Sequence, residues 1–402
     1  MMKIKILIPL IFSLIVLFFA CSNSPPVIRS LTADPSTVEL GEISKISVSA
    51  IIYRGDHVTF RWSATGGTII GDSYEITWVA PEKEGTYTIT CIVDDGTGAQ
   101  DISSVDVDVI AKTWQTVTTL DGIASNKILS VESTSKGEYI AGTDFGVSLY
   151  IDETWRNENK DTTLPDNNVI ALFVDEDDVI WIGTQEGLVE YNKGEEKWTT
   201  ITTNDGMPSN RVQAIVLDND KNLWVGTDQG LGYRDSSKDW HIYTVDDGLP
   251  SNNITSVDVD SDNNIWVGTD KGIAKYDREV FTIYDESNGL FDDNIYTLSV
   301  DSSNNVWAGS DALVTMIGSN EEFSYYTPDE GVPDFPVVAS DIDILGRPWF
   351  ATYGGGAFRI KDEVVEVKNS TDGLVSDFVN DVKFDKKSGN LLFGTDEGLS
   401  IY

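Results

Sequence analysis

Two aromatic residues interrupt a series of polar side chains in the second half of the chain. One repeated position holds an amide or a carboxylate in every copy except the sixth, which has Phe335. A second position, directly after a Gly-Thr pair or its equivalent, holds an amide or a carboxylate in every copy except the sixth, which has Tyr353. Rings beside amides and carboxylates suit a sugar or another polyhydroxylated ligand, since rings stack on sugar faces and polar groups pair with hydroxyls. The candidate ligand-binding residues are Phe335, Tyr353, Arg211, Asn210, Asp228, Asn252 and Asp270.

The repeated polar residues also have an explanation that involves no ligand. Asp-Gly pairs supply turns with positive φ, and Ser or Asn side chains cap free backbone groups. A residue that occurs in every copy of a repeat serves every copy, so Asn210 and Asn252 are first of all candidates for turn residues. The rings of Phe335 and Tyr353 can likewise simply close the centre of the fold.

Most kinds of catalytic site lack their residues in this chain. It contains two histidines, His57 and His241, and two cysteines, Cys21 and Cys91. Histidine metal sites, Ser-His-Asp triads and Cys-His pairs are therefore excluded or nearly so. We expect a binding protein with no catalytic residues. A hydrolase or lyase that uses only carboxylates is the less favoured alternative.

The candidate residues belong to a repeat of about 42 residues, a period typical of propellers and related repeat folds. A large apolar residue stands two positions before each anchor. The anchors are Gly142-Thr143, Gly183-Thr184, Gly226-Thr227, Gly268-Thr269, Gly309-Ser310, Ala351-Thr352 and Gly394-Thr395. Each copy contains four short runs of β-branched and aromatic residues separated by turn residues. The pattern predicts an all-β fold with a seven-bladed β-propeller over residues 114–402. Strand 114–119 is expected to complete the last blade and so leave no free sheet edge.

The repeated phrase resembles that of the two-component regulator propeller family. It is clearest in Asn222 to Leu231 (NLWVGTDQGL), in Asn264 to Ile273 (NIWVGTDKGI) and in the preceding Asp247 to Asn252 (DGLPSN). In that family the propeller is the periplasmic ligand-sensing part of bacterial sensor kinases, and it also occurs without a kinase. The resemblance implies a sensor-like, ligand-binding propeller, here without a kinase.

The N-terminal residues read as an export signal. Two lysines precede an apolar run from Ile6 to Ala20, and Cys21 follows. The Ala20-Cys21 junction looks like a bacterial lipoprotein cleavage site, so we expect a signal peptide and lipobox over residues 1–21 and lipidation of Cys21. An uncleaved N-terminal anchor is the alternative. Either arrangement holds the protein at a membrane in the bacterial cell envelope, periplasmic or at the cell surface.

A second region precedes the repeats. After a linker at residues 22–28, residues 29–111 lack the 42-residue phrase and contain runs that alternate apolar and polar residues, as in a small sandwich. Trp62 to Gly67 (WSATGG) and Trp78 to Pro81 (WVAP) resemble bacterial immunoglobulin-like or PKD-type modules. We expect an immunoglobulin-like β-sandwich that acts as a spacer.

A formal charge of −38 excludes whole classes of partner. Nucleic acids and anionic lipid surfaces bind through Lys and Arg, so we expect no nucleic-acid partner. The expected partners are a small molecule or glycan, with docking of other envelope proteins as the alternative. No cofactor is expected. Calcium is the alternative for the Asp- and Asn-rich segments 218–222 and 260–264, which turn chemistry also explains.

Overall fold

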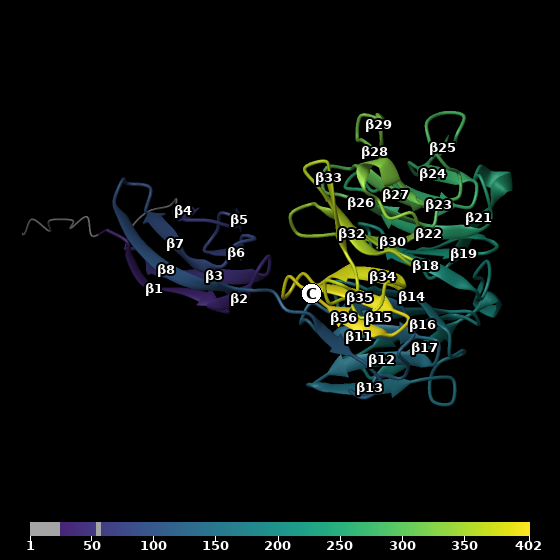
Figure 1. The fold of residues 1–402 in the computed structure, drawn as a ribbon, viewed down its shortest axis with the longest axis horizontal. Helices are drawn as coiled ribbons and strands as arrows, with labels where there is room; N and C mark the ends of the chain where they lie inside the picture. Colours follow the sequence, from purple (N-terminus) through teal and green to yellow (C-terminus); the bar gives the residue numbers. More distant parts are fainter. Residues whose placement is uncertain (1–24, 54–57) are drawn as a thin grey trace, which may run out of the picture. The chain divides into compact units, whose positions relative to one another are not determined.

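The computed structural model describes residues 25–53 and 58–402, which form two compact units (Figure 1). The first contains the described residues up to Val38 together with Ser44–Ile110. The second contains Glu39–Ile43 and Ala111–Tyr402. The predicted signal peptide and Cys21 lie outside the described residues. Within the described ranges, no helix has the length and apolar character needed to span a membrane.

The first unit consists of two four-stranded sheets, in the orders β1-β3-β6-β5 and β2-β8-β7-β4. The strands are β1 (Val27–Asp34), β2 (Thr37–Glu39), β3 (Ile43–Ile51), β4 (Thr59–Ala64), β5 (Thr68–Ile70), β6 (Glu75–Val79), β7 (Gly85–Asp94) and β8 (Gln100–Ile110). Alternate residues of β7 are buried, and Cys91 and Val93 pack with Val48 of the other sheet. The apolar residues thus lie between the two sheets.

The second unit is a series of four-stranded, blade-like sheets. The first sheet has β10 (Ile128–Ser133), β11 (Tyr139–Thr143), β12 (Gly146–Ile151) and β13 (Thr154–Glu158). The second has β14 (Val169–Val174), β15 (Val179–Thr184), β16 (Leu188–Asn192) and β17 (Lys197–Ile201). The third has β18 (Val212–Leu217), β19 (Leu223–Thr227), β20 (Gly230–Arg234) and β21 (Trp240–Tyr243). The fourth and fifth are β22 (Ile254–Val259), β23 (Ile265–Thr269), β24 (Gly272–Tyr276) and β25 (Phe281–Tyr284); and β26 (Thr297–Val300), β27 (Val306–Ser310), β28 (Leu313–Ile317) and β29 (Phe323–Tyr326).

The sixth sheet has β30 (Val337–Ile342), β31 (Pro348–Thr352), β32 (Gly356–Lys361) and β33 (Val364–Lys368). The last has β34 (Val379–Phe384), β35 (Leu391–Thr395), β36 (Gly398–Ile401) and β9 (Gln115–Val117). Helix is limited, in the described part of the chain, to three single turns: η1 (Thr203–Asp205), η2 (Val245–Asp247) and η3 (Pro328–Glu330). The prediction of an all-β fold with a propeller-like repeat is confirmed.

The repeated tryptophan explains why each copy folds in the same way. Trp224 of β19 is 1 % exposed and packs against Tyr233 of the next strand, with ring centroids 4.5 Å apart. Its indole Nε1 donates to Asp218, at the end of the preceding strand, over 3.0 Å. Trp266 and Asp260 make the same 3.0 Å bond in the next sheet. The repeat thus places an aromatic core and its hydrogen-bond acceptor together.

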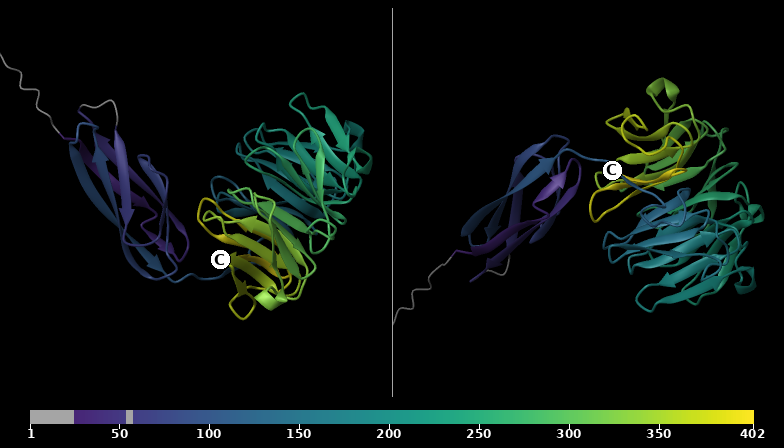
Figure 2. Two further views of the ribbon diagram at one scale, coloured as in Figure 1. Left: turned by 90° about the horizontal axis from the view of Figure 1, so that it is seen from above. Right: turned by 60° about the horizontal axis from the view of Figure 1, so that its bottom comes forward.

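The two ends of the second unit meet in one sheet. β9 pairs antiparallel with β36, with Val117 opposite Leu399. Side chains of β34 also reach the first sheet, because Asp381 accepts a hydrogen bond from the Val131 N–H over 2.8 Å. The yellow C-terminal strands and the blue strands β11–β13 accordingly lie side by side in both sets of views (Figures 1 and 2).

Candidate functional site

Loops from neighbouring sheets come together along one face of the second unit. The turn between the second and third strands of a sheet bonds to the connection that leads to the next sheet. The Gly272 N–H donates to the Asp293 carbonyl over 2.7 Å, and the Gly356 N–H donates to the Asp377 carbonyl over 2.9 Å. We call this the loop face. Because these bonds fix the two loops to each other, the two repeated positions identified in the sequence lie close together.

Three exposed rings gather on the loop face between the sixth and the last sheet. Phe335, Tyr353 and Phe378 are 42 %, 42 % and 46 % exposed. The rings of Tyr353 and Phe378 meet edge to face, with centroids 5.2 Å apart. The Phe335 ring covers the Gly354 backbone so closely that a Cβ added at Gly354 would lie 2.6 Å from its Cδ1 atom. We call these three rings the aromatic patch. Large exposed rings grouped in this way are typical of a binding surface.

Phe335 stands where other copies have an Asn or Asp side chain that accepts a main-chain hydrogen bond. In the third sheet Asn210 Oδ1 accepts the Thr203 N–H, seven residues earlier, over 2.8 Å, and Asn252 does the same for Val245 over 2.9 Å. Seven residues before Phe335 stands Pro328, which has no N–H to satisfy. The donor and the acceptor are therefore absent together, and the aromatic side chain leaves no unpaired backbone group at that place.

A polar rim lies against the aromatic patch. Asp396 accepts hydrogen bonds from the Tyr353 hydroxyl over 3.3 Å and from Asn380 Nδ2 over 2.9 Å. Lys127 directly precedes β10, and its Nζ atom lies 3.9 Å from the Asp396 carboxylate. Rings, an amide, a carboxylate and an ammonium group thus meet within one region. This combination can stack on an apolar face and also exchange hydrogen bonds with hydroxyl groups.

The other predicted site residues lie in the third and fourth copies of the repeat. Asn210 and Asn252 use their carbonyl oxygens in the loop bonds given above. Arg211 is exposed, and the Asp228 Oδ1 atom is buried without a hydrogen-bond partner. Asp270 accepts from Asn253 Nδ2 over 3.3 Å. Within residues 58–402, no hydrogen bond, ion pair or ring contact joins these five residues to Phe335 or Tyr353, so they lie apart from the aromatic patch.

Sequence reasoning missed four members of the region: Phe378, Asp396, Asn380 and Lys127. The signal for Phe378 was present, because it occupies the same repeat position as Arg211, directly after the residue that corresponds to Phe335. Asp396 does not stand out in the sequence, because most copies have Asp at that position. Its contacts with Tyr353 and Asn380 depend on packing between copies, which no pattern within one copy reveals.

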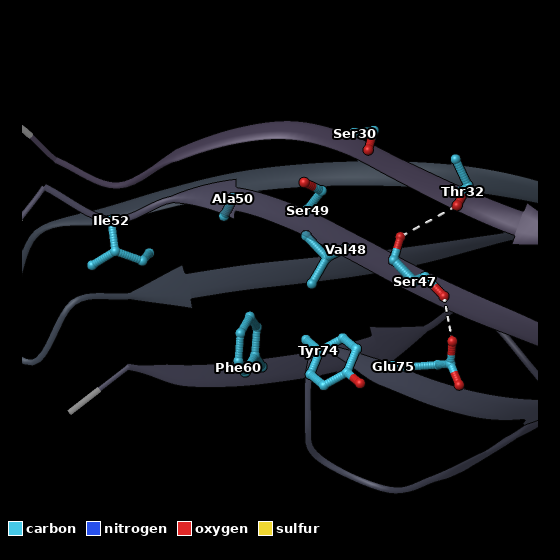
Figure 3. A pocket seen from close by; sticks show the side chains of 10 residues that line it. All are labelled: Ser30, Thr32, Ser47, Val48, Ser49, Ala50, Ile52, Phe60, Tyr74 and Glu75. Atoms are coloured by element: carbon cyan, nitrogen blue, oxygen red, sulfur yellow. Dashed lines mark hydrogen bonds between the residues drawn. The ribbon is translucent and has the colours of Figure 1, made fainter. Parts of the chain in front are cut away.

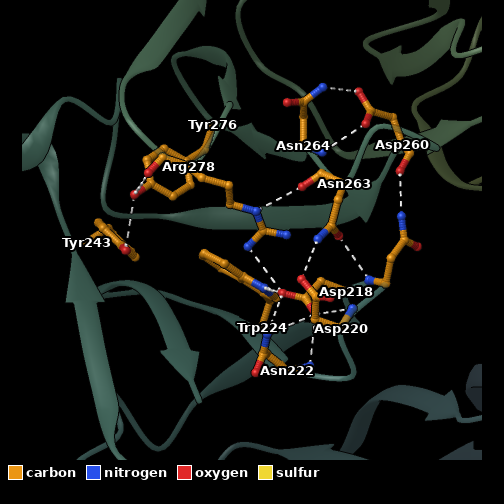
Figure 4. A network of polar contacts seen from close by, with 11 residues as sticks. Asp218, Asp220, Asn222, Trp224, Tyr243, Asp260, Asn263, Asn264, Tyr276 and Arg278 are labelled. Carbon is orange, nitrogen blue, oxygen red and sulfur yellow. Dashed lines mark hydrogen bonds and ion pairs between the residues drawn. The ribbon is translucent and has the colours of Figure 1, made fainter. Parts of the chain in front are cut away.

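The segments considered for calcium have other partners for their oxygens (Figure 4). Asp218 Oδ1 accepts the main-chain N–H groups of Asp220 and Asn222 over 3.0 and 2.9 Å. Its Oδ2 accepts Trp224 Nε1 and lies 3.2 Å from Arg278 Nη1. Burial alone would raise the pKa of Asp218, but these hydrogen bonds and the Arg278 charge lower it below the ordinary value. Asp218 therefore serves as the anchor of its turn and tryptophan. In the described part of the chain, no three acidic, histidine or cysteine side chains are placed to ligate one metal ion.

A second group of charged residues lies on the innermost strands. Lys383 Nζ contacts Glu132 Oε1 over 2.8 Å, and Asp258, Asp341 and Asp381 lie on the first strands of their sheets. Burial raises the pKa of Asp258 to about 6 and that of Asp381 to about 7. Burial alone would lower the pKa of Lys383, but the carboxylates around it raise it above the ordinary value. In this group Glu132 is buried and the other four side chains are partly buried.

These raised pKa values predict that the protein is more stable in mild acid. Asp258 and Asp381 bind protons in the folded chain up to about pH 6 and 7, but in the unfolded chain only near pH 4. Folding therefore takes up protons in this window, and stability falls as pH rises through it. Urea unfolding at pH 5.5 and pH 8 is expected to differ by about 3 kcal/mol, about two thirds of it from Asp381. The variant Asp381→Asn should lose most of that difference; an unchanged difference would contradict the assignment.

An open groove of about 500 Å³ occurs in the first unit (Figure 3). Hydroxyl side chains of Ser30, Thr32 and Ser47 line one part, and the rings of Phe60 and Tyr74 line another. Ser47 Oγ already donates to Glu75 Oε2 over 3.0 Å. The groove shares the mixed chemistry of the aromatic patch, but no residue of it was a predicted site residue.

The comparisons with known proteins agree with the repeat. The two-component regulator propeller family matches residues 163–186, 206–229 and 248–271. These segments carry the second, third and fourth copies of the Gly-Thr anchor. None of the curated proteins matches the chain.

Several solved structures share the fold. The extracellular domain of BT4673, a putative hybrid two-component system of B. thetaiotaomicron, has a TM-score of 0.60 at 19 % identity and matches 72 % of this chain. The corresponding domain of BT3049 has a TM-score of 0.65 at 17 % identity and matches 89 % of this chain. The chain spans 39 % and 59 % of these two domains. PorZ, a surface component of the type-IX secretion system of Porphyromonas gingivalis, has a TM-score of 0.57 at 16 % identity, over 92 % of this chain and 68 % of PorZ.

Proposed function

We propose that this protein is a sensor-like binding protein of the bacterial cell envelope whose loop face holds a glycan or a similar polyhydroxylated ligand. The observation that carries the proposal is the aromatic patch together with its polar rim. The Tyr353 and Phe378 rings supply an exposed apolar surface, and Asp396 with Asn380 supplies acceptors and donors beside it. A sugar has an apolar face and a hydroxyl edge, which matches this arrangement.

The proposal includes a closed ring of seven blades. Seven four-stranded sheets follow one another in the second unit, and β9 occupies the outer position of the last sheet. Asp381 and Lys383 of that sheet bond to Val131 and Glu132 of the first. These bonds support closure of the ring between the two ends of the unit. Closure would bring loops from all seven copies around one centre on the loop face.

The proposal also includes the immunoglobulin-like sandwich as a spacer and the lipid anchor at Cys21. Two facing sheets with a shared apolar interior support the sandwich. The similarity to extracellular domains of two-component systems supports a position outside the cytoplasm. Metabolic labelling with a clickable palmitate analogue, in the native sequence and in Cys21→Ala, tests the anchor.

Glycan binding is tested with substitutions in the aromatic patch. A glycan array followed by calorimetry is expected to identify a ligand of the native chain. Combined Tyr353→Ala and Phe378→Ala substitution should weaken its binding at least 100-fold, since stacking on both rings is lost. The matched control is Phe291→Ala, which removes another exposed ring, 58 % exposed, whose contact is with Tyr325. Equal affinity in the double variant would place the ligand elsewhere.

Docking of another envelope protein is the second candidate. PorZ, which shares the fold, is a component of a secretion system, and exposed rings are also common at protein interfaces. Under this alternative, crosslinking in the native envelope captures a partner protein, the double variant loses it, and no glycan binds. A hydrolase or lyase would instead turn the glycan over and lose turnover after single Asp→Asn changes.

A further inference from the structure

Five sheets carry polar or charged side chains at one equivalent position of their innermost strand. The position is the residue directly opposite the repeated tryptophan or its replacement on the second strand. Asp258 pairs with Trp266, Ser299 with Trp307, and Asp341 with Trp349. Lys383 and Glu132 occupy the same position in the last and first sheets, opposite Leu392 and Ile140. Because the register is shared, these side chains lie at one level of the inner strands.

The acids in this group outnumber the bases. Glu132, Asp258, Asp341 and Asp381 carry four negative charges when ionised, and Lys383 carries one positive charge, which leaves an excess of three. We call these five residues, with Ser299, the inner-strand cluster. Lys383 lies in direct contact with Glu132. The direct partners of the other three carboxylates are neutral: main-chain N–H groups and, for Asp381, also the Ser130 hydroxyl.

Asp258 and Asp341 each accept an N–H group of the neighbouring sheet. Asp258 Oδ2 accepts the Val300 N–H over 2.7 Å, and Asp341 Oδ2 accepts the Phe384 N–H over 2.7 Å. These bonds hold the carboxylates in place without neutralising them. The other oxygen of Asp341, Oδ1, is not used in that bond. It is therefore an acceptor with capacity to spare.

Ser299 gives an independent indication that something is bound here. It is 6 % exposed, and its Oγ atom is buried without a hydrogen-bond partner. Its sheet lies between those of Asp258 and Asp341, and its side chain occupies the same position as theirs. Ser is too short to make the bond to the next strand that both aspartates make. Buried hydroxyl groups are almost always paired, so this one indicates a missing donor or acceptor.

The residues around Ser299 indicate the chemistry of the missing partner. No three of the described acidic side chains converge on one point that suits a metal ion, so a bare cation does not fit. An ammonium group fits better, because its N–H donors point in separate directions and pair with separate acceptors. The second and third sheets offer Phe173 and Val216 at the equivalent position, opposite Trp181 and Trp224, which gives part of the level an apolar wall.

From this arrangement we infer that the inner-strand cluster binds a primary alkylammonium ligand, a monoamine or a diamine. The ammonium group donates to Asp341 Oδ1 and Ser299 Oγ, and the alkyl chain lies toward the apolar part of the wall. This site is distinct from the aromatic patch. It rests on the proposed closure of the ring, which brings the inner strands around one centre.

Calorimetry of the full chain at pH 7.5 with n-butylammonium chloride and 1,4-diaminobutane tests the site. We expect binding with a stoichiometry of one and a rise in the unfolding temperature. Tetramethylammonium chloride, which has no N–H donors, and sodium chloride at equal ionic strength should give neither. An equal response to these salts would show that the amines merely screen the acidic surface, and the inference would be wrong.

Variants separate the site from the general acidity of the surface. Asp341→Asn retains an acceptor for the Phe384 N–H and should weaken amine binding at least tenfold. Ser299→Ala, which removes one buried oxygen and little volume, should weaken amine binding about threefold. This variant tests the site if Asp341→Asn does not fold. The charge-matched control Asp246→Asn lies on the exposed turn η2 and should bind amines as the native chain does. Unchanged affinity in both Asp341→Asn and Ser299→Ala would overturn the inference.

The outcome is independent of the glycan experiment. Asp341→Asn is expected to keep the glycan affinity of the native chain, and the Tyr353→Ala and Phe378→Ala double variant should keep its amine affinity. If one variant loses its own ligand and the other variant keeps its own, the proposal whose variant keeps its ligand is the one that has failed.

Discussion

Replacing Asp218 by Ala is expected to lower the free energy of unfolding by about 3 to 5 kcal/mol, the range found when a buried ion pair loses one partner. The Asp218 side chain is completely buried and lies 3.2 Å from Arg278 Nη1. Its removal leaves the Trp224 indole and two turn N–H groups without an acceptor. Arg278 would remain over the Trp224 ring, 5.1 Å from its centroid, without its carboxylate partner.

Urea unfolding followed by tryptophan fluorescence measures this effect. The control is Asp246→Asn, which changes an exposed acid of η2 and should alter stability by less than about 0.5 kcal/mol. Asp218→Asn should lie between the two, since an amide keeps one acceptor but loses the charge that pairs with Arg278. A loss below about 1 kcal/mol for Asp218→Ala would show that the turn finds its hydrogen bonds elsewhere.

Replacing Trp114 by Ala is expected to cost about 3 kcal/mol, at the lower end for large aromatic residues because Trp114 is only partly buried. Its ring packs on Tyr402 and Phe393, with centroids 4.5 and 5.7 Å away. Trp114 directly precedes β9, so it fixes the strand that borders β36. Loss of the ring should therefore loosen the last sheet more than any other.

Hydrogen exchange followed by mass spectrometry resolves where the loss occurs. In Trp114→Ala we expect faster exchange in β36 and β9 and little change in β18 to β21. Thr119→Ala, an exposed neighbour beyond β9, is the control. Uniformly faster exchange would contradict a local closure role, and unchanged exchange in β36 would show that β9 adds nothing to the sheet.

The sequence was sufficient for the repeat because each copy contains its own determinants. The tryptophan, its Asp acceptor and the Gly-Thr turn occur within ten residues, as at 218–227, and the whole copy contains four short β-rich runs, so the sequence alone indicates four short strands. Pairing of β9 with β36 was also predictable, because the last copy lacks its outer strand and Trp114 to Thr119 resembles the missing piece.

The candidate site was less predictable, because its members come from different copies. Tyr353 and Phe335 are exceptions to the repeat, whereas their neighbour Phe378 lies at a position, that of Arg211, which varies between copies. The Asp381 contact with Val131 and the Lys383 contact with Glu132 join residues about 250 positions apart. A pattern within one copy carries no information about such pairs.

The joint replacement of the Asn acceptor by Phe335 and of its donor by Pro328 has a consequence for how this surface can change over evolution. In the other connections between sheets, the Asn or Asp side chain at that position accepts a main-chain N–H, so an apolar residue there would leave that N–H without its acceptor. The sixth connection has no such hydrogen bond, because Pro328 has no N–H to donate. Residue 335 is consequently free to drift in size and polarity and can redirect what the protein recognises while the ring stays intact.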